Sequence, residues 1–153
     1  MASLPSGIAY PAVRMPSILN GKPNGKLPSE ILVTIPMPGG GSAVMLGIAA
    51  RAFTAMMAAA TQFRWMQQGD YRTYDEQVAL LKARYIPVSY AADIYWSGTW
   101  WKHVSGATVA KPGTSNHGWG LALDLAENLD ADPQAESISQ AAVNWLVINA
   151  YRF

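Results

Sequence analysis

The densest chemical signal in the sequence is Pro112-Gly113-Thr114-Ser115-Asn116-His117-Gly118-Trp119-Gly120-Leu121-Ala122-Leu123-Asp124-Leu125. Its first half is loop-like, because three glycines let the backbone bend and approach its neighbours closely. Its second half alternates, so leucines 121, 123 and 125 share one strand face while Ala122 and Asp124 share the other. His117, on the loop before this strand, can fold back over the Asp124 face. An imidazole and a carboxylate beside small residues suit a zinc ion, although a structural His–Asp hydrogen bond fits the same pattern.

Length and composition exclude several classes of protein. The chain has 153 residues, half of them hydrophobic and 14% charged, which predicts one globular domain with its own core. The net charge of +1 gives no electrostatic argument for a nucleic-acid partner. The absence of cysteine excludes disulfides and thiolate metal ligands. The apolar stretch 44–60 is interrupted by Arg51 and is shorter than the roughly 20 residues of a membrane span, so we expect a buried helix and no span.

The N-terminal part differs in composition from the rest. Residues 1–41 hold seven of the ten prolines and end in three glycines, which excludes long helices there. We therefore expect an extended arm over residues 1–41, with one short strand at 30–35, followed by a domain over residues 42–153. The arm either wraps the domain as a loop or serves as a tether for assembly. Residues 1–6 lack the basic start and apolar stretch of a secretory signal.

The remaining sequence predicts an α+β fold, with helices packed on a small, mostly antiparallel sheet. Ser42 is a candidate cap for a helix over residues 43–61, and the alternation in residues 62–67 favours a short strand. Thr73 and Glu76 form a T-x-x-E capping box for a helix that reaches about Arg84. A second capping pattern at Ser137 predicts a last helix up to residue 153. That helix has no stop signal after it, which favours a chain that continues.

The motif Ser115-x-His117-x-x-Gly120-x-Ala122-x-Asp124 resembles the S-x-H-x-x-G-x-A-x-D signature of the VanY-like D-alanyl-D-alanine carboxypeptidases. These belong to the LAS metallopeptidases, which include D-Ala-D-Ala dipeptidases and phage L-alanyl-D-glutamate endolysins. Residues 69–77 are similar to the family's G-Y-R-S-x-x-x-Q element, with one more residue between Gly and Tyr. The sequence around both motifs and at residues 24–28 is most similar to that of actinobacterial and actinophage members. The resemblance spans roughly residues 20–153 and implies an LAS/hedgehog-type metallopeptidase domain.

The resemblance implies roles for five residues. His117 and Asp124 would be zinc ligands. Arg72 would hold a carboxylate or carbonyl of the cell-wall peptide, Gln77 would stand beside it in the cleft, and Ser115 would contact substrate. The residues themselves support Arg72, because it precedes a predicted helix N-terminus that favours an anion, and its planar fork suits a carboxylate. A surface arginine without a substrate role is the alternative.

The sequence departs from the family in one respect. The family's third zinc ligand, a His, and its general base, a Glu, come from a later E-P-W-H or E-x-x-H element. That element is expected after residues 145–153, where this sequence has nothing more. His103 matches no ligand position, and Glu127 and Glu136 follow the motif too closely to match the base. We therefore expect a C-terminally incomplete domain that contains no catalytic general base.

Two functions of different classes fit these observations. The first is a zinc-dependent peptidase that cleaves the peptide stem of peptidoglycan, as a D-Ala-D-Ala carboxypeptidase or a phage endolysin-type endopeptidase, completed by a C-terminal segment or second chain. The second is a non-catalytic structural or cell-wall-binding component of a phage virion, with virion proteins as partners. We expect a phage protein that stays in the virion or the host cytoplasm until lysis and acts at the cell wall. The aromatic residues between 90 and 101 either stack on glycan, pack on peptide or cover the core.

Overall fold

The computed structural model describes residues 14–128 and 138–153, which form a mixed α+β fold. Its helices are α1 (Gly47–Ala59), α2 (Tyr74–Arg84) and α3 (Gln140–Asn149). Its strands are β1 (Leu32–Pro36), β2 (Ser42–Leu46), β3 (Trp65–Gly69), β4 (Tyr85–Val88), β5 (Ile94–Trp96), β6 (Thr99–His103) and β7 (Asp124–Glu127). Single 3-10 turns lie at Ser17–Leu19, Ser29–Ile31, His117–Trp119 and Ala150–Arg152.

The strands of the described residues form three small antiparallel sheets. β1 pairs with β2, β3 pairs with β7, and β4, β6 and β5 form a three-stranded sheet in that order. In the last sheet, Trp100 on the central strand lies opposite both Val88 and Tyr95. The predicted α+β class is therefore confirmed, with the antiparallel pairing divided among three sheets.

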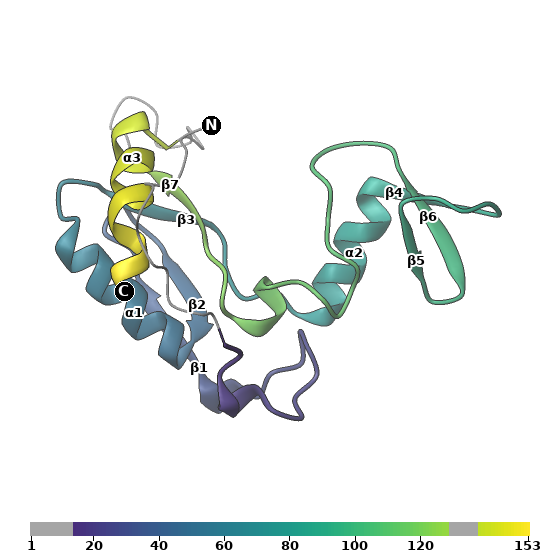
Figure 1. The fold of residues 1–153 in the computed structure, drawn as a ribbon, viewed down its shortest axis with the longest axis horizontal. Helices are drawn as coiled ribbons and strands as arrows, with labels where there is room; N and C mark the ends of the chain where they lie inside the picture. Colours follow the sequence, from purple (N-terminus) through teal and green to yellow (C-terminus); the bar gives the residue numbers. More distant parts are fainter. Residues whose placement is uncertain (1–13, 129–137) are drawn as a thin grey trace.

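The elements fall into two groups (Figure 1). One group, which we call the core lobe, holds α1, α3 and strands β1, β2, β3 and β7. The other, which we call the hairpin lobe (residues 74–110), holds α2, the β4-β6-β5 sheet and the loop that follows β6. The chain crosses between the lobes after β3 and again before β7. Residues near these crossings are therefore placed to line a site between the two groups.

The main hydrophobic core lies in the core lobe. Its centre is Trp65, which is 0% exposed. Buried residues from β1, β2, α1 and α3, and from the positions directly after β1 and α1, pack around it: Ile35, Met37, Ala43, Met45, Ala50, Phe53, Met56, Met57, Ala60 and Ala142. A second cluster joins Leu19 and Leu27 to Leu46. Each fully buried side chain of this size stabilises the fold by about 1.5–3 kcal/mol, so the described part of the N-terminal stretch contributes to the domain's stability.

The helix predicted over residues 43–61 is wrong at its start. Residues Ser42–Leu46 form strand β2, and α1 begins only after them. Ser42 is therefore not a helix cap. The strand is favoured because its alternate side chains Ala43 and Met45 are buried, and because β1 supplies partners for its backbone. Tertiary pairing has overridden the helix propensity of an Ala- and Met-rich segment.

The other predicted elements agree more closely with the structure. The strand expected near residues 30–35 is present as β1, and the one expected at 62–67 is present, slightly later, as β3. The capping box of α2 is confirmed: the Glu76 amide donates to the Thr73 hydroxyl at 3.3 Å, and the Glu76 carboxylate accepts from the Thr73 amide at 2.8 Å. The last helix is capped by Ser139, whereas the predicted cap Ser137 lies outside the described residues. None of the described helices is long and apolar enough to span a membrane.

Candidate metal centre

The structure brings His117 and Asp124 together at the edge of the core lobe. His117 begins the 3-10 turn that leads towards β7, and Asp124 is the first residue of that strand. The His117 Nε2 and Asp124 Oδ2 atoms are 3.4 Å apart, and the two side chains are 15% and 58% exposed. Ala122 and Asp124 line one cleft, whereas the three leucines 121, 123 and 125 line an apolar hollow of about 320 Å³. The alternation in the sequence thus separates a polar face from an apolar one.

A backbone carbonyl determines which ring nitrogen of His117 is available. His117 Nδ1 lies 2.9 Å from the carbonyl oxygen of Asp70. A carbonyl oxygen can only accept, so in the neutral imidazole Nδ1 carries the proton and Nε2 has the lone pair. A metal-binding histidine is commonly oriented by such a hydrogen bond from its other nitrogen. The Nε2 atom that faces Asp124 is therefore the one able to bind a metal.

The separation of the two side chains fits a shared metal better than a hydrogen bond. Good N–H···O hydrogen bonds are about 2.7–3.2 Å long, whereas His117 Nε2 and Asp124 Oδ2 are 3.4 Å apart. Two ligands that are each about 2.0–2.1 Å from a tetrahedral zinc ion lie roughly 3.3–3.5 Å apart. The type and spacing of these two donors therefore suit adjacent ligand positions on zinc.

Gly69 makes room for the carboxylate of Asp124. The pairing of β3 with β7 is irregular between Gln67 and Gly69, and Gly69 lies opposite Asp124. A Cβ atom on Gly69 would lie 2.6 Å from Asp124 Oδ2 and 3.6 Å from Arg72 Nη2. Only glycine lets the carboxylate and the guanidinium come this close to the strand. The sequence placed Gly69 in the element that resembles G-Y-R-S-x-x-x-Q, but it did not predict this contact with Asp124.

The glycines of the motif loop allow close backbone approach. Gly120 has a left-handed conformation (φ 64°, ψ 23°) and ends the 3-10 turn. Its carbonyl accepts from the Leu46 amide at 2.9 Å, and a Cβ on Gly120 would lie 2.7 Å from that same nitrogen. This contact fixes the motif loop onto the start of α1 and so fixes where His117 lies relative to β7.

Gln77 lies beneath the cleft and holds together the segments that line it. Its side chain is buried, its Oε1 accepts from the Gly113 amide at 2.9 Å, and its Nε2 donates to Asn24 Oδ1 at 3.1 Å and to the Arg72 carbonyl at 3.3 Å. Asn24 in turn donates to the Ser115 carbonyl at 2.8 Å. The geometry gives Gln77 a positioning role, whereas the resemblance placed it beside substrate. Asn24 was missed because a single asparagine in a proline-rich loop gives no functional signal.

Ser115 and Arg72 line the same cleft as the His–Asp pair. Ser115 is buried, and its hydroxyl accepts from the His117 amide at 3.3 Å. Arg72 stands just before the N-terminus of α2, and its amide donates to the His117 carbonyl at 3.1 Å. Backbone contact and shared lining thus keep the guanidinium near the metal-type pair. This arrangement suits a ligand that carries a carboxylate.

Glu76 shows the electrostatic character of this helix end. Its pKa is lowered chiefly by the hydrogen bond from the Thr73 hydroxyl, then by the Thr73 amide and by the charge of Arg72, with slight burial opposing them. The carboxylate is therefore ionised at neutral pH and used in the capping box. It stabilises the helix that positions Arg72. Arg72 lines the cleft, whereas Glu76 does not.

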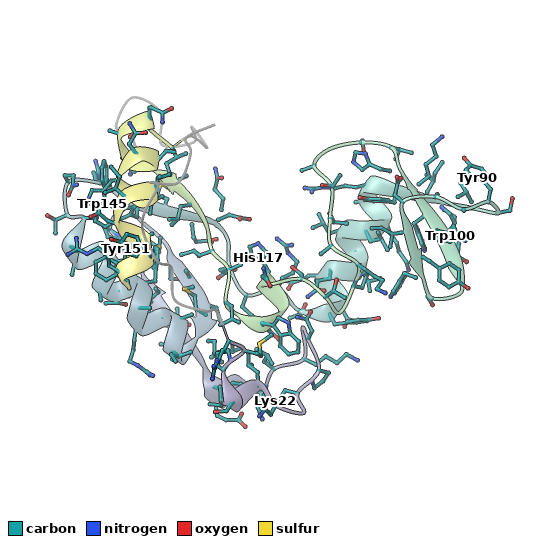
Figure 2. The ribbon with its side chains drawn as sticks, viewed as in Figure 1. Lys22, Tyr90, Trp100, His117, Trp145 and Tyr151 are labelled. Atoms are coloured by element: carbon teal, nitrogen blue, oxygen red, sulfur yellow. The ribbon has the colours of Figure 1, made fainter. Side chains whose placement is uncertain are left out.

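The cleft, of about 640 Å³, has one wall from each lobe. The core lobe contributes Gln68, Ala122 and Asp124, and the hairpin lobe contributes Leu80, Arg84 and residues 107–110. Figure 2 shows His117 between the two groups of elements. Arg84, which the sequence did not single out, is a second guanidinium in the cleft and donates to the Ala107 carbonyl at 2.9 Å. Two arginines beside a metal-type pair suit an anionic peptide.

Two further ligand candidates are used elsewhere. Among residues 14–128 and 138–153, no group of three His, Cys, Asp or Glu side chains could hold a metal ion. Glu127 is buried and accepts from the Ser139 amide at 2.7 Å, so it serves the start of α3. His103 is occupied within the hairpin lobe, with Nε2 2.9 Å from the Gly106 carbonyl oxygen. Glu136 lies outside the described residues. The described part of the chain therefore supplies two ligand positions, and Asp124 is the one carboxylate that lines the cleft there.

Two comparisons with known proteins gave a match. The family model for VanY, D-alanyl-D-alanine carboxypeptidase, matches residues 43–153. A solved structure of a variant of the vancomycin-resistance D,D-pentapeptidase VanY from a VanB-type resistance cassette, in complex with Zn(II), is similar with a TM-score of 0.49 and 20% identity. The match covers 82% of this chain and 67% of that one. A search of curated proteins gave no match.

Proposed function

We propose, because this chain belongs to the VanY family of D-alanyl-D-alanine carboxypeptidases, that it is a zinc-dependent peptidase domain acting on the peptide stem of peptidoglycan. The observation that carries this proposal is the 3.4 Å approach of His117 Nε2 to Asp124 Oδ2 in a cleft that Arg72 also lines. A hydrolase of this class needs a held metal, a carboxylate-binding group and an open site. The described residues supply parts of all three.

In the proposed reaction, His117 and Asp124 would hold the metal. A bound zinc ion would polarise the scissile carbonyl and lower the pKa of a bound water. The Asp70 carbonyl keeps the His117 proton on Nδ1, so Nε2 stays available throughout. The Gly69 backbone leaves Asp124 room to turn its carboxylate towards the same point. These contacts fix the ligands before the metal arrives, which reduces the conformational entropy lost on binding.

Arg72 would bind the substrate's terminal carboxylate. Its guanidinium offers a planar pair of donors that match a carboxylate, and the N-terminus of α2 adds a favourable dipole for an anion. This favours a carboxypeptidase, because a free C-terminus presents a carboxylate next to the scissile bond. An endolysin-type endopeptidase would instead use Arg72 on a carbonyl or a side-branch carboxylate. Stem peptides with free and amidated C-termini distinguish the two: loss of cleavage on amidation supports the carboxypeptidase.

We further propose that a third zinc ligand and a Glu general base come from residues additional to those described, in a longer polypeptide or a second chain. Within the described residues, β7 pairs with β3 only, and the adjoining hollow is lined by leucines 121, 123 and 125 together with α1 and α3 residues. A strand added along β7 would direct alternate side chains into this apolar hollow. The intervening side chains would face the cleft beside Asp124, where a His and a Glu are needed.

The test measures zinc binding and peptide hydrolysis on the same protein. The purified chain is dialysed against zinc, its zinc content is determined, and cleavage of a D-Ala-D-Ala-terminated pentapeptide is followed by release of D-alanine. We expect weak zinc binding and slow hydrolysis by the chain alone, and a large gain when a strand carrying Glu and His is fused to it or added as a second chain. Fast zinc-dependent hydrolysis by the unmodified chain would contradict the proposed completion. No zinc binding and no gain from any added segment would contradict the peptidase itself.

The second candidate is a non-catalytic cell-wall-binding or structural component of a phage virion. It is favoured by the lack of a third ligand among the described residues. It predicts binding to peptidoglycan sacculi without release of soluble peptide, whether or not zinc is present. We propose the same place of action, the bacterial cell wall, for both candidates, with delivery by a phage particle or by lysis. Release of D-alanine by the completed protein would exclude the non-catalytic candidate.

A further inference from the structure

The two faces of the β4-β6-β5 sheet differ in how completely the protein uses them. On one face, Tyr85 is 4% exposed and its hydroxyl accepts from the Val109 amide at 3.4 Å. The Trp101 indole N–H on that face donates to the Trp96 carbonyl at 3.3 Å. The imidazole of His103 packs against Tyr85 with ring centroids 5.0 Å apart. The polar side-chain atoms of Tyr85, Trp101 and His103 therefore have partners within the protein, and the loop after β6 contacts this face through Val109.

The opposite face is open. The strand register places Val88, Trp100 and Tyr95 in one row across the three strands, with Ile86 and Lys102 in the next row. Tyr95 is 53% exposed and Ile86 is 47% exposed. The rings of Tyr95 and Trp100 are tilted, with centroids 5.1 Å apart. Within the described residues the Trp100 indole N–H and the Tyr95 hydroxyl make no hydrogen bond with protein atoms.

Beside this row of rings the surface is hollowed rather than flat. A hollow of about 410 Å³ is lined by Pro87, Val88, Ser89, Gly98, Thr99 and Trp100. Its lining residues include one tryptophan and two residues that carry hydroxyl groups, of which Thr99 comes from the other face of the sheet by strand alternation. Ser97 and Gly98 have φ values of +52° and +77°, which is the geometry of a tight two-residue hairpin turn. The turn fixes the spacing of Tyr95 and Trp100, so the rings are held in place before a ligand arrives.

The composition of this face selects its ligand. Lys102 is the one charged residue in its two rows, which is too little positive charge for a polyanion. An apolar protein or lipid surface would bury the free indole N–H, the phenol and the hydroxyls without partners, which is unfavourable. A neutral ligand with an apolar ring face and a polar edge satisfies both kinds of group. Pyranose rings have this character, with C–H bonds on one face and hydroxyl or acetamido groups around the edge.

We propose that the open face around Tyr95 and Trp100 binds an amino-sugar polysaccharide, the glycan strand that carries the stem peptide. The choice of polymer rests on the proposed function. The same hairpin lobe forms a wall of the cleft through Leu80, Arg84 and residues 107–110. A glycan held on this lobe would keep its attached peptides near the cleft. Binding at this second subsite raises the local concentration of the next stem peptide without any change at the metal.

The experiment titrates the whole chain with chitotetraose, a tetramer of N-acetylglucosamine, in the presence of EDTA and again with zinc. Tryptophan fluorescence and amide chemical shifts report binding. We expect saturable binding that is the same with and without zinc, with shift changes concentrated in residues 86–102. Trp100→Ala and Tyr95→Ala should each weaken it by about tenfold or more. Tyr151→Ala, which alters an exposed tyrosine of the core lobe, is the matched control and should leave it unchanged.

Trp100→Phe covers the case in which Trp100→Ala does not fold: it keeps a ring, removes the indole N–H and should give an intermediate affinity. Absence of saturable binding by the folded wild-type chain, or binding that the Trp100 and Tyr95 variants leave intact, would overturn the proposal. So would binding to neutral phosphatidylcholine vesicles in place of the saccharide, or dimer formation through this face. The saccharide titration is run without metal, so its result can be interpreted even if the peptidase assay shows no activity. Conversely, a failure to bind the saccharide would not contradict the proposed metal centre.

Discussion

The chain's two histidines occupy regions that resemble each other at one ring nitrogen and differ at the other. His117 has Nδ1 at 2.9 Å from the Asp70 carbonyl oxygen, and His103 has Nε2 at 2.9 Å from the Gly106 carbonyl oxygen. At its second nitrogen, His117 faces the Asp124 carboxylate. His103 instead lies in the aromatic layer of the hairpin lobe, with its ring against Tyr85.

A histidine becomes a ligand candidate through what lies at its second ring nitrogen. A backbone hydrogen bond alone fixes a ring, and both regions have one. A metal site also needs a second donor with a free lone pair, close to the remaining nitrogen and open to solvent. Only the His117 region meets this condition among the described residues. The His103 region uses the same kind of hydrogen bond for packing.

The largest expected effect separates the two histidines directly. His117→Ala removes a direct ligand and should lower zinc affinity by more than about 100-fold, beyond the 10–100-fold typical of losing an outer partner. His103→Ala should keep the zinc affinity and lower the free energy of unfolding by roughly 1 kcal/mol through lost ring packing. Zinc titration by calorimetry and thermal unfolding measure both. Equal loss of zinc in the two variants would break the comparison.

The next effect asks whether substrate recognition also belongs to the His117 region. Arg72→Ala should weaken binding of a D-Ala-D-Ala-terminated stem peptide by about 10- to 150-fold, because a charged hydrogen bond contributes roughly 1.5–3 kcal/mol. Arg51→Ala is the control, since Arg51 is exposed on α1 and lines a different hollow. Fluorescence anisotropy of a labelled peptide gives both affinities. An Arg72→Ala chain with unchanged affinity would assign peptide recognition to another residue.

A smaller effect tests how the His117 region is kept open. Gly69→Ala would set a Cβ 2.6 Å from Asp124 Oδ2, so the carboxylate has to turn away and zinc affinity should fall by about tenfold. Gly47→Ala is the matched control, because its new Cβ would meet its nearest atom at an ordinary 3.5 Å. Metal competition with a chromophoric chelator measures both. Wild-type zinc affinity in Gly69→Ala would mean that Asp124 is not held against that strand.

The smallest effect concerns α2, which begins just after Arg72 and ends at Arg84. Thr73→Ala removes the cap of α2 and should lower the free energy of unfolding by about 1 kcal/mol at neutral pH. The pKa of Glu76 is lowered in the folded protein, so its stabilisation is present above its usual pKa of 4.5 and is lost as the pH falls through the lower folded value. The variant should therefore lose less stability on acidification than wild type.

Thermal unfolding between about pH 7 and pH 3 tests this linkage. Ser29→Ala is the control, because Ser29 is exposed and lies in a 3-10 turn whose start has no side-chain cap. An identical acid dependence in wild type and Thr73→Ala would show that the Glu76 hydrogen bonds do not contribute to stability.

Local patterns in the sequence predicted much of this site. The T-x-x-E pattern gave the cap of α2, and the alternation of residues 121–125 gave the two faces on either side of Asp124. These local patterns could not predict contacts between segments that are distant in the sequence. β2 was taken for helix because its strand character comes from β1, and Asn24 was missed because its partners are Gln77 and Ser115. The Asp70 carbonyl was missed for the same reason, since its partner His117 lies far along the chain. Gly69 was noticed as part of a motif, but its contact with Asp124 was not predicted.

The Asn24–Ser115 hydrogen bond also bears on the timing of synthesis. The two residues are 91 positions apart in the chain, and ribosomes add about 5–20 residues per second. Asn24 therefore waits roughly 5–20 seconds for its partner to be translated. The Arg72 and Gly113 segments, which join through Gln77, can be fixed only after that interval. The nascent chain has no His117–Asp124 pair until residue 124 has been translated, so metal uptake at this pair follows that point of synthesis.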